Sequence, residues 1–196
     1  EFLKEYLPTH PIPVILVSSL NLKVFDALSA GAVDFVRKPT SDDTQAAFIT
    51  ALAQKVLVAS MSRVRVAPAP AGAAAPAAPV APAGLLGGGP SLNNVVVGLG
   101  ASTGGTEATL EVMKRLPADI PPMVIVQHMP KGFTQMYAAR LNNLCQMEVR
   151  EAKNGDELHR GLALVAPADL QARVVRIGDK YTLSCTPGEK VSGHRP

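Results

Sequence analysis

The sequence predicts an α/β protein in which two units with parallel strands are joined by a linker. Short aliphatic runs alternate with longer segments of helical spacing, which is typical of parallel sheets with crossover helices. Residues 66–94 contain no charged residue and consist mostly of alanine, proline and glycine, which favours a semi-extended spacer. We therefore expect a first unit over residues 1–63, a linker over 64–94 and a second, doubly wound unit over 95–196.

Composition excludes several classes of protein. The hydrophobic fraction of 47% supports a sizeable core, and the net charge of +3 is spread without a basic run, which does not favour nucleic-acid binding. Cys145 and Cys185 lie far apart and form no C-x-x-C motif, so neither a disulfide framework nor a zinc site is indicated. The sequence shows no signal peptide and no apolar run long enough to span a membrane. We expect a cytoplasmic protein without membrane insertion.

The first unit follows a strand-helix-strand-helix pattern after the end of a helix over residues 1–7. The apolar run over 13–19, which ends in two serines, predicts a strand. A helix whose apolar side includes Leu22, Phe25 and Leu28 is expected to follow and to end at Gly31. A second strand is predicted over 32–36, and helical spacing predicts a helix over 42–60 capped by Ser41 or Asp42. This pattern is half of a doubly wound domain.

These residues resemble part of a known family. The runs P-V-I-L-V-S-S and S-A-G-A-V-D-F-V-R-K-P are similar to the carboxyl-terminal half of a response-regulator receiver domain, which has a flavodoxin-like fold. The resemblance implies that Ser18 is the switch hydroxyl, Lys38 contacts a phosphoryl group, Phe35 is the aromatic switch and the Lys38–Pro39 peptide is cis. It places the phosphorylated aspartate and the carboxylates that hold Mg²⁺ upstream of Glu1. Without the resemblance, Lys38 is a solvated lysine at a strand end.

The second unit opens on Val95-Val96-Val97, an apolar run that predicts a buried parallel strand. The segment from Gly100 to Gly104 is a G-x-S-x-G pattern, which places a serine, Ser102, on a sharp turn at the end of a strand. The free N–H groups of the following helix can hold an anion or an oxyanion there. Two alternatives stay open: a phosphate-binding loop made by Gly98, Gly100 and Gly104, or a tight turn without chemistry.

A histidine follows the next predicted strand. Residues 123–128 form an apolar run that ends in His128, and the ligand crevice of an open α/β sheet lies at the carboxyl ends of its strands. Neighbouring strands are about 4.8 Å apart, so Ser102 and His128 can reach hydrogen-bonding distance. The pair then forms a nucleophile and its base, with the amides near Thr103 and Gly104 stabilising an oxyanion. The alternatives are a packing histidine at His128, and a Thr103 that orients the histidine or caps the helix.

The remaining elements complete the second unit. A helix over 106–116 is expected to bury Thr109, Val112, Met113 and Leu116, and residues 133–144 form a clear amphipathic helix. Strands are predicted over 147–150 and 161–167, with a turn at Asn154-Gly155 between them. Residues 173–185 indicate a β-hairpin that turns at Gly178-Asp179.

This unit also resembles one family along its whole length. The motifs V-G-L-G-A-S-T-G-G-T-E-A, V-Q-H-M-P-K-G-F-T, A-R-L-N-N-L-C and the terminal H-R-P are similar to the catalytic domain of the CheB chemotaxis methylesterases. The resemblance implies hydrolysis of glutamate γ-methyl esters on methyl-accepting chemoreceptors, and deamidation of receptor glutamines, with no metal or nucleotide at the catalytic site. It makes Ser102 the nucleophile and His128 the base. It also implies control by phosphorylation of the receiver, with a sensor histidine kinase as phosphodonor and Mg²⁺ only in the complete receiver.

Two departures from the family pattern bear on activity. The resemblance places the aspartate of the catalytic triad beyond Pro196, and Gln171 stands where the family usually has a histidine. Three other carboxylates, Asp119, Asp156 and Asp169, match no motif of the family. We therefore expect a fragment of a longer polypeptide that is poorly active by itself. Two other functions stay open: a regulatory domain that binds a phosphorylated or nucleotide ligand at the glycine-rich loop, and a tethered interaction module.

Overall fold

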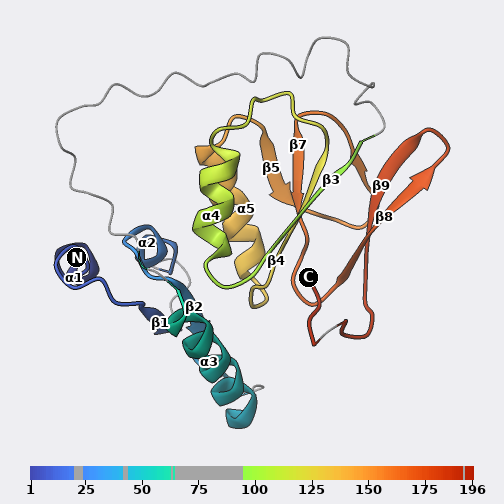
Figure 1. The fold of residues 1–196 in the computed structure, drawn as a ribbon. Helices are drawn as coiled ribbons and strands as arrows, with labels where there is room; N and C mark the ends of the chain where they lie inside the picture. Colours follow the sequence, from blue (N-terminus) through green and yellow to red (C-terminus); the bar gives the residue numbers. More distant parts are fainter. Residues whose placement is uncertain (20–23, 42–43, 63, 65–94, 192) are drawn as a thin grey trace, which may run out of the picture. The chain divides into compact units, whose positions relative to one another are not determined.

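The computed structural model describes residues 1–19, 24–41, 44–62, 64, 95–191 and 193–196. Contacts divide the chain into two compact units, residues 1–75 and 76–196, and each is described by itself below (Figure 1). The predictions for Leu22, for a cap at Asp42 and for nearly all of the linker lie outside the described residues. In the part of the chain that is described, no helix is long and apolar enough to cross a membrane.

The first unit has the predicted order of elements. It consists of α1 (Phe2–Tyr6), β1 (Ile15–Ser18), α2 (Val24–Ser29), β2 (Asp34–Arg37) and α3 (Gln45–Ser60). Strands β1 and β2 pair in parallel, with Ser18 opposite Arg37, as the crossover through α2 requires. Gly31 ends the α2 segment at φ +104°, and a Cβ there would lie 2.8 Å from the Leu7 side chain. The stop predicted at this glycine is therefore confirmed.

Two details of this unit differ from the sequence prediction. Helix α3 is capped by Thr44, whose hydroxyl accepts a hydrogen bond from the Ala47 amide, so the prediction of a cap at Ser41 is wrong. Thr44 takes this position because its extended backbone directs the hydroxyl at the first turn of the helix. The described residues contain no cis peptide bond, so the Lys38–Pro39 peptide is trans and that expectation is also wrong. A trans bond is the more stable isomer before most prolines.

The second unit contains a four-stranded parallel sheet in the order β3-β4-β7-β5. Its strands are β3 (Val97–Ala101), β4 (Met123–Gln127), β5 (Glu148–Glu151) and β7 (Leu162–Val165). The prediction of a buried strand at the start of this unit is wrong, because among the described strands β3 pairs only with β4, and it exposes Gly98 and Gly100. The fully buried strand is β7, which lies between β4 and β5.

Two helices pack side by side on one face of this sheet, as Figure 1 shows in green and orange. They are α4 (Gly105–Met113) and α5 (Phe133–Leu144), and the bounds of α5 match the prediction. Helix α4 buries Leu110 and Met113, whereas Val112 is 52% exposed, so its expected inward orientation is wrong. Thr109 and Met113 are buried as expected, and Leu110, three residues before Met113, lies on the buried face in place of Val112. Phe133, Tyr137 and Leu141 form the buried face of α5.

An antiparallel sheet belongs to the same unit and contributes to a second core. It has the order β6-β9-β8, with β6 (Asp156–Leu158), β8 (Gln171–Ile177) and β9 (Lys180–Thr186). The predicted hairpin and its turn at Gly178-Asp179 are confirmed, while β6 was not predicted. Leu162 and Leu164 of β7 pack with Leu158 and Leu183 of this sheet. The helices and the antiparallel sheet therefore contact different residues of the parallel sheet, whose side chains alternate between its faces.

Candidate active site

The site lies at the carboxyl ends of β3 and β4. These strands pair in parallel with Ala101 opposite Gln127, and the amide of His128 continues the ladder by donating to the Ala101 carbonyl at 3.3 Å. This register places the next residue of each strand, Ser102 and His128, side by side. Both residues therefore lie at the carboxyl ends of the strands, where open α/β sheets bind ligands.

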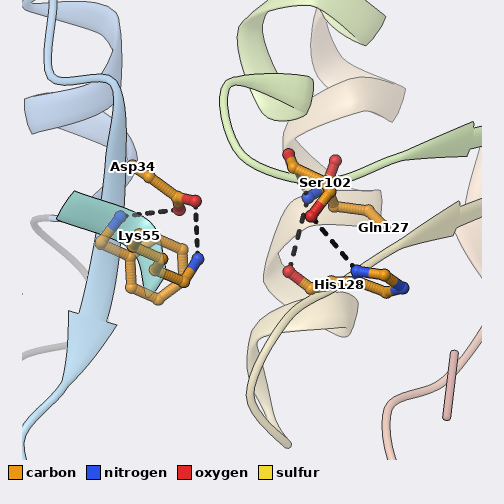
Figure 2. A network of polar contacts seen from close by, with 6 residues as sticks. Asp34, Lys55, Ser102, Gln127 and His128 are labelled. Atoms are coloured by element: carbon orange, nitrogen blue, oxygen red, sulfur yellow. Dashed lines mark hydrogen bonds and ion pairs between the residues drawn. The ribbon is translucent and has the colours of Figure 1, made fainter. Parts of the chain in front are cut away.

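Ser102 and His128 are in hydrogen-bonding contact (Figure 2). The serine Oγ lies 3.2 Å from Nδ1 of the histidine ring, which confirms the expected proximity of the two side chains. Ser102 is exposed and His128 is half-buried, so a substrate can reach the hydroxyl. In the tautomer with hydrogen on Nε2, the hydroxyl donates to Nδ1, which is the arrangement that a base needs to take the proton of an attacking alcohol.

The turn after Ser102 leads directly into α4. Gly104 is the N-cap of this helix and has φ +75°, a conformation that favours glycine. The alternative in which Thr103 caps the helix is therefore wrong, because the cap lies one residue later. In the part of the chain that the structure describes, the amides of Thr103 and Gly104 donate no hydrogen bond. Sequence analysis predicts that these two amides stabilise an oxyanion, and that role stays a prediction.

The glycines do not form a phosphate-binding loop of the usual kind. Gly98 and Gly100 lie inside β3, before the turn, at positions opposite Val124 and Val126 of β4. Only Gly104 lies in the turn itself. A loop that holds phosphate needs several successive amides directed at the ligand, so this geometry favours a nucleophile turn over a ligand loop.

Two residues near the pair were missed by sequence analysis. Gln127, 2% exposed, donates through Nε2 to the Ser102 carbonyl at 2.9 Å. The ring of His194 stacks on that of His128, with centroids 3.9 Å apart and planes inclined by 14°. His194 was passed over as one of several scattered histidines. Its place in the terminal H-R-P motif, which contributed to the family resemblance, was the available signal.

Comparison with known proteins gives the family of this chain. The sequence model of the family described as CheB methylesterase matches residues 97–196. The chain belongs to the CheB methylesterase family. The crystal structure of the Thermotoga maritima CheB methylesterase catalytic domain is similar to it, with 34% sequence identity and a TM-score of 0.50, over 52% of this chain and 54% of that one. The predicted α/β class with a parallel sheet is confirmed by this match.

Curated relatives of the CheB family align with the whole chain. It is 42% identical over 198 residues to protein-glutamate methylesterase/protein-glutamine glutaminase 2 of Syntrophomonas wolfei, a match that covers 100% of this chain and 55% of the relative. It is 43% identical over 210 residues to the protein-glutamate methylesterase/protein-glutamine glutaminase of Syntrophotalea carbinolica, a match that covers 100% of this chain and 56% of that relative. The chain therefore spans about half the length of these curated relatives.

The carboxylates singled out in this CheB-family sequence have other contacts. Asp156 pairs with Arg150 and accepts from the Lys153 amide at 2.7 Å, and Asp119 lies 3.3 Å from Arg160. Burial raises the pKa of Asp156, but these hydrogen bonds more than offset it and hold the pKa below its usual value. Asp169 lies in a tight turn, with φ +68°. Gln171 donates to the Glu189 carbonyl at 2.5 Å.

Neither Cys145 nor Cys185 is suited to act as a nucleophile. Burial raises the pKa of the Cys145 thiol and that of the Cys185 thiol above the usual value. A raised pKa keeps a thiol protonated, and the thiolate is the nucleophilic form. Among the described residues, no group of three or more histidine, cysteine or acidic side chains could hold a metal ion.

Two of the receiver-like residues, Ser18 and Lys38, lie together at the carboxyl ends of β1 and β2, whereas Phe35 lies inside β2 opposite Leu16. Ser18 ends β1, and the Lys38 amide, just after β2, donates to the Ser18 carbonyl at 3.0 Å. Phe35 is 3% exposed, and Lys55 of α3 lies over its ring. Lys55 also pairs with Asp34 at 2.6 Å (Figure 2). The structure thus brings Ser18 and Lys38 together; their roles as switch hydroxyl and phosphoryl contact stay predictions.

Proposed function

We propose that this chain carries the nucleophile and the base of a protein-glutamate methylesterase that also deamidates glutamine. The observation that carries the proposal is the 3.2 Å contact between the Ser102 hydroxyl and the His128 ring at the carboxyl edge of the sheet. Both curated relatives described above bear the name protein-glutamate methylesterase/protein-glutamine glutaminase, which supports the same substrate class. The substrates are methyl-accepting chemoreceptors, reached in the cytoplasm.

The reaction takes place in two steps. The Ser102 Oγ attacks the γ-carbonyl carbon of the methylated glutamate while His128 takes the hydroxyl proton. The tetrahedral oxyanion is stabilised by the amides of Thr103 and Gly104, and methanol leaves with the proton from His128. Water, deprotonated by His128, then attacks the acyl-enzyme, and glutamate and the free Ser102 hydroxyl are regenerated. With a glutamine substrate the leaving group is ammonia. No step requires a metal ion or nucleotide at this site.

The experiment measures methanol release from methylated receptor by a polypeptide that contains this chain and extends to the full length of its relatives. We expect Ser102→Ala to lower turnover by at least about 10³-fold, because removing the nucleophile of a serine hydrolase costs up to about 10⁶. Ser184→Ala, a serine of β9 in the same unit, is the matched control and keeps full turnover. Turnover that survives in Ser102→Ala excludes the hydrolase and supports a ligand-binding regulator or a tethered interaction module.

We also propose that the first unit regulates this activity as a receiver domain. The support is the juxtaposition of Ser18 and Lys38 at one sheet edge, where a phosphoryl group from a sensor histidine kinase would be contacted. Mg²⁺ would be held by carboxylates outside residues 1–196. The unphosphorylated receiver would restrict access to the crevice. Deletion of residues 1–90 from the full-length protein is expected to raise basal turnover, and unchanged turnover contradicts this control.

A further inference from the structure

Gln127 is a buried amide whose location calls for an explanation. It ends β4, one residue before His128, and is 2% exposed. Because side chains alternate along a strand, Gln127 shares a face of β4 with Met123 and Ile125, both buried and apolar. Burying an amide costs free energy unless hydrogen bonds compensate, so its contacts indicate what it stabilises.

The amide nitrogen of Gln127 joins the ends of the two strands that carry the catalytic pair. Nε2 donates to the Ser102 carbonyl at 2.9 Å and to the His128 carbonyl at 3.4 Å (Figure 2). Oε1 is buried, and within the described residues it has no hydrogen-bond partner. It lies against Gly105, where a Cβ would be only 2.4 Å from this oxygen. Glycine at the first position of α4 therefore provides the space that the amide occupies.

The hydrogen bond from Gln127 fixes the orientation of one peptide group. The Ser102 carbonyl accepts both from Gln127 and from the Gly105 amide, the latter at 2.7 Å. In a planar trans peptide, the carbonyl of one residue and the N–H of the next point in opposite directions. With the Ser102 carbonyl held toward Gln127 and Gly105, the Thr103 N–H is directed away from them. In a serine turn of this kind, the N–H after the nucleophile donates to the oxyanion.

We propose that Gln127 is a positioning residue for the methylesterase reaction: by holding the Ser102 carbonyl, it orients the Thr103 amide toward the developing oxyanion. The inference rests on the proposed function, because it assigns a role within that reaction. Loss of the amide removes one of the two hydrogen bonds that hold the Ser102 carbonyl, so the Ser102–Thr103 peptide is less firmly oriented. The oxyanion develops mainly in the transition state, so the loss affects kcat and leaves binding of the ester substrate unchanged.

The test compares kcat and KM for methylated receptor in full-length variants. Gln127→Leu removes the amide, and Gln127→Glu keeps its shape but replaces the donor by an acceptor that repels the Ser102 carbonyl. We expect kcat to fall about 10- to 100-fold in both, less than the 10²–10³ lost when an oxyanion donor is removed outright, with KM within about twofold. Ile125→Val, a buried change on the same strand, controls for lost stability and keeps kcat.

The outcomes separate this inference from the proposed function. The rate at which a fluorophosphonate labels Ser102 is measured alongside, because an Oγ–P bond forms, fluoride leaves and His128 takes the proton whatever the natural ester. Labelling without receptor turnover overturns the proposed substrate, and the labelling rate of the variants then decides the role of Gln127. Normal kcat or labelling in a folded Gln127 variant, or a change in KM alone, overturns the positioning role. If neither variant folds, Gly105→Ala decides, because its methyl group displaces the same amide.

Discussion

The ion pair between Glu107 of α4 and Arg140 of α5 joins the two helices that pack on one face of the parallel sheet. Nη1 of the arginine lies 2.8 Å from Oε1 and Nη2 lies 3.2 Å from Oε2, which is a bidentate arrangement. The side chain of Arg140 is 14% exposed and that of Glu107 is 34% exposed. Helix α4 begins just after Ser102 and α5 begins shortly after His128, so this pair joins the two segments that follow Ser102 and His128.

The exposure of the two side chains sets the expected magnitude. Exposed pairs contribute about 0–1 kcal/mol, whereas breaking a fully buried pair costs about 3–5 kcal/mol. We expect Glu107→Gln to lower the free energy of unfolding by about 2 kcal/mol, and a double-mutant cycle with Arg140→Met to give a coupling energy of about 1–2 kcal/mol. The cycle removes the separate contribution of an acidic residue in the first turn of a helix, about 0.3–1 kcal/mol.

Urea unfolding, followed in the transition of the second unit, measures these energies. With a slope of about 1–3 kcal/mol per molar, a loss of 2 kcal/mol lowers the midpoint by about 1 M. The matched control is the exposed pair Lys114–Glu111 on the same helix, 3.5 Å apart, for which we expect a coupling energy below about 0.5 kcal/mol. Equal coupling energies for the two pairs would refute the argument from burial and bidentate geometry.

Two further predictions concern charged groups away from the catalytic pair. Because the pKa of Asp156 is lowered in the folded state, its stabilising contribution is present at neutral pH and is lost as the pH falls below about 4. Asp156→Asn is expected to lower the free energy of unfolding by about 1–2 kcal/mol at pH 7 and to make that free energy less dependent on pH in the acid range. An unchanged pH dependence contradicts this. Lys55→Met removes the cationic partner of the buried Asp34 carboxylate, which keeps its hydrogen bond from the Phe35 amide. The change is expected to lower the free energy of unfolding of the first unit by about 2–4 kcal/mol in urea, partly restored by Asp34→Asn, and a loss below about 0.5 kcal/mol contradicts it.

Local sequence patterns were sufficient where the chain itself determines the structure. The turn at Ser102 is encoded by neighbouring glycines, and His128 directly follows an apolar strand, so both were placed at a strand end before any coordinates. The bounds of α5 and the hairpin turn at Gly178 also follow from local spacing and turn chemistry. In each case the signal lies within a few residues of the feature it predicts.

Predictions failed where burial depends on residues far away in the chain. Val95-Val96-Val97 has the composition of a buried strand, but β3 pairs with only one strand in the described sheet. Helical spacing correctly predicts α3, yet Val56 and Leu57 are 51% and 63% exposed. Sequence analysis did not identify Gln127, because a glutamine at a strand end matches no motif. Its role depends on contacts with Ser102 and Gly105, which only the fold brings close to it.

The geometry of the candidate site is a consequence of strand register. Ala101 pairs with Gln127, so Ser102 and His128 become neighbours only because each is the next residue after a paired position. A parallel strand rises about 3.3 Å per residue, and side chains of successive residues point to opposite faces. A slip by two residues would move the imidazole about 6.6 Å from the hydroxyl, and a slip by one would place it on the other face. Gln127, at the end of β4, opposes such slips, because its amide hydrogen-bonds to the Ser102 carbonyl just after the end of β3. The residue that we propose to orient the oxyanion amide thus also holds Ser102 and His128 in register.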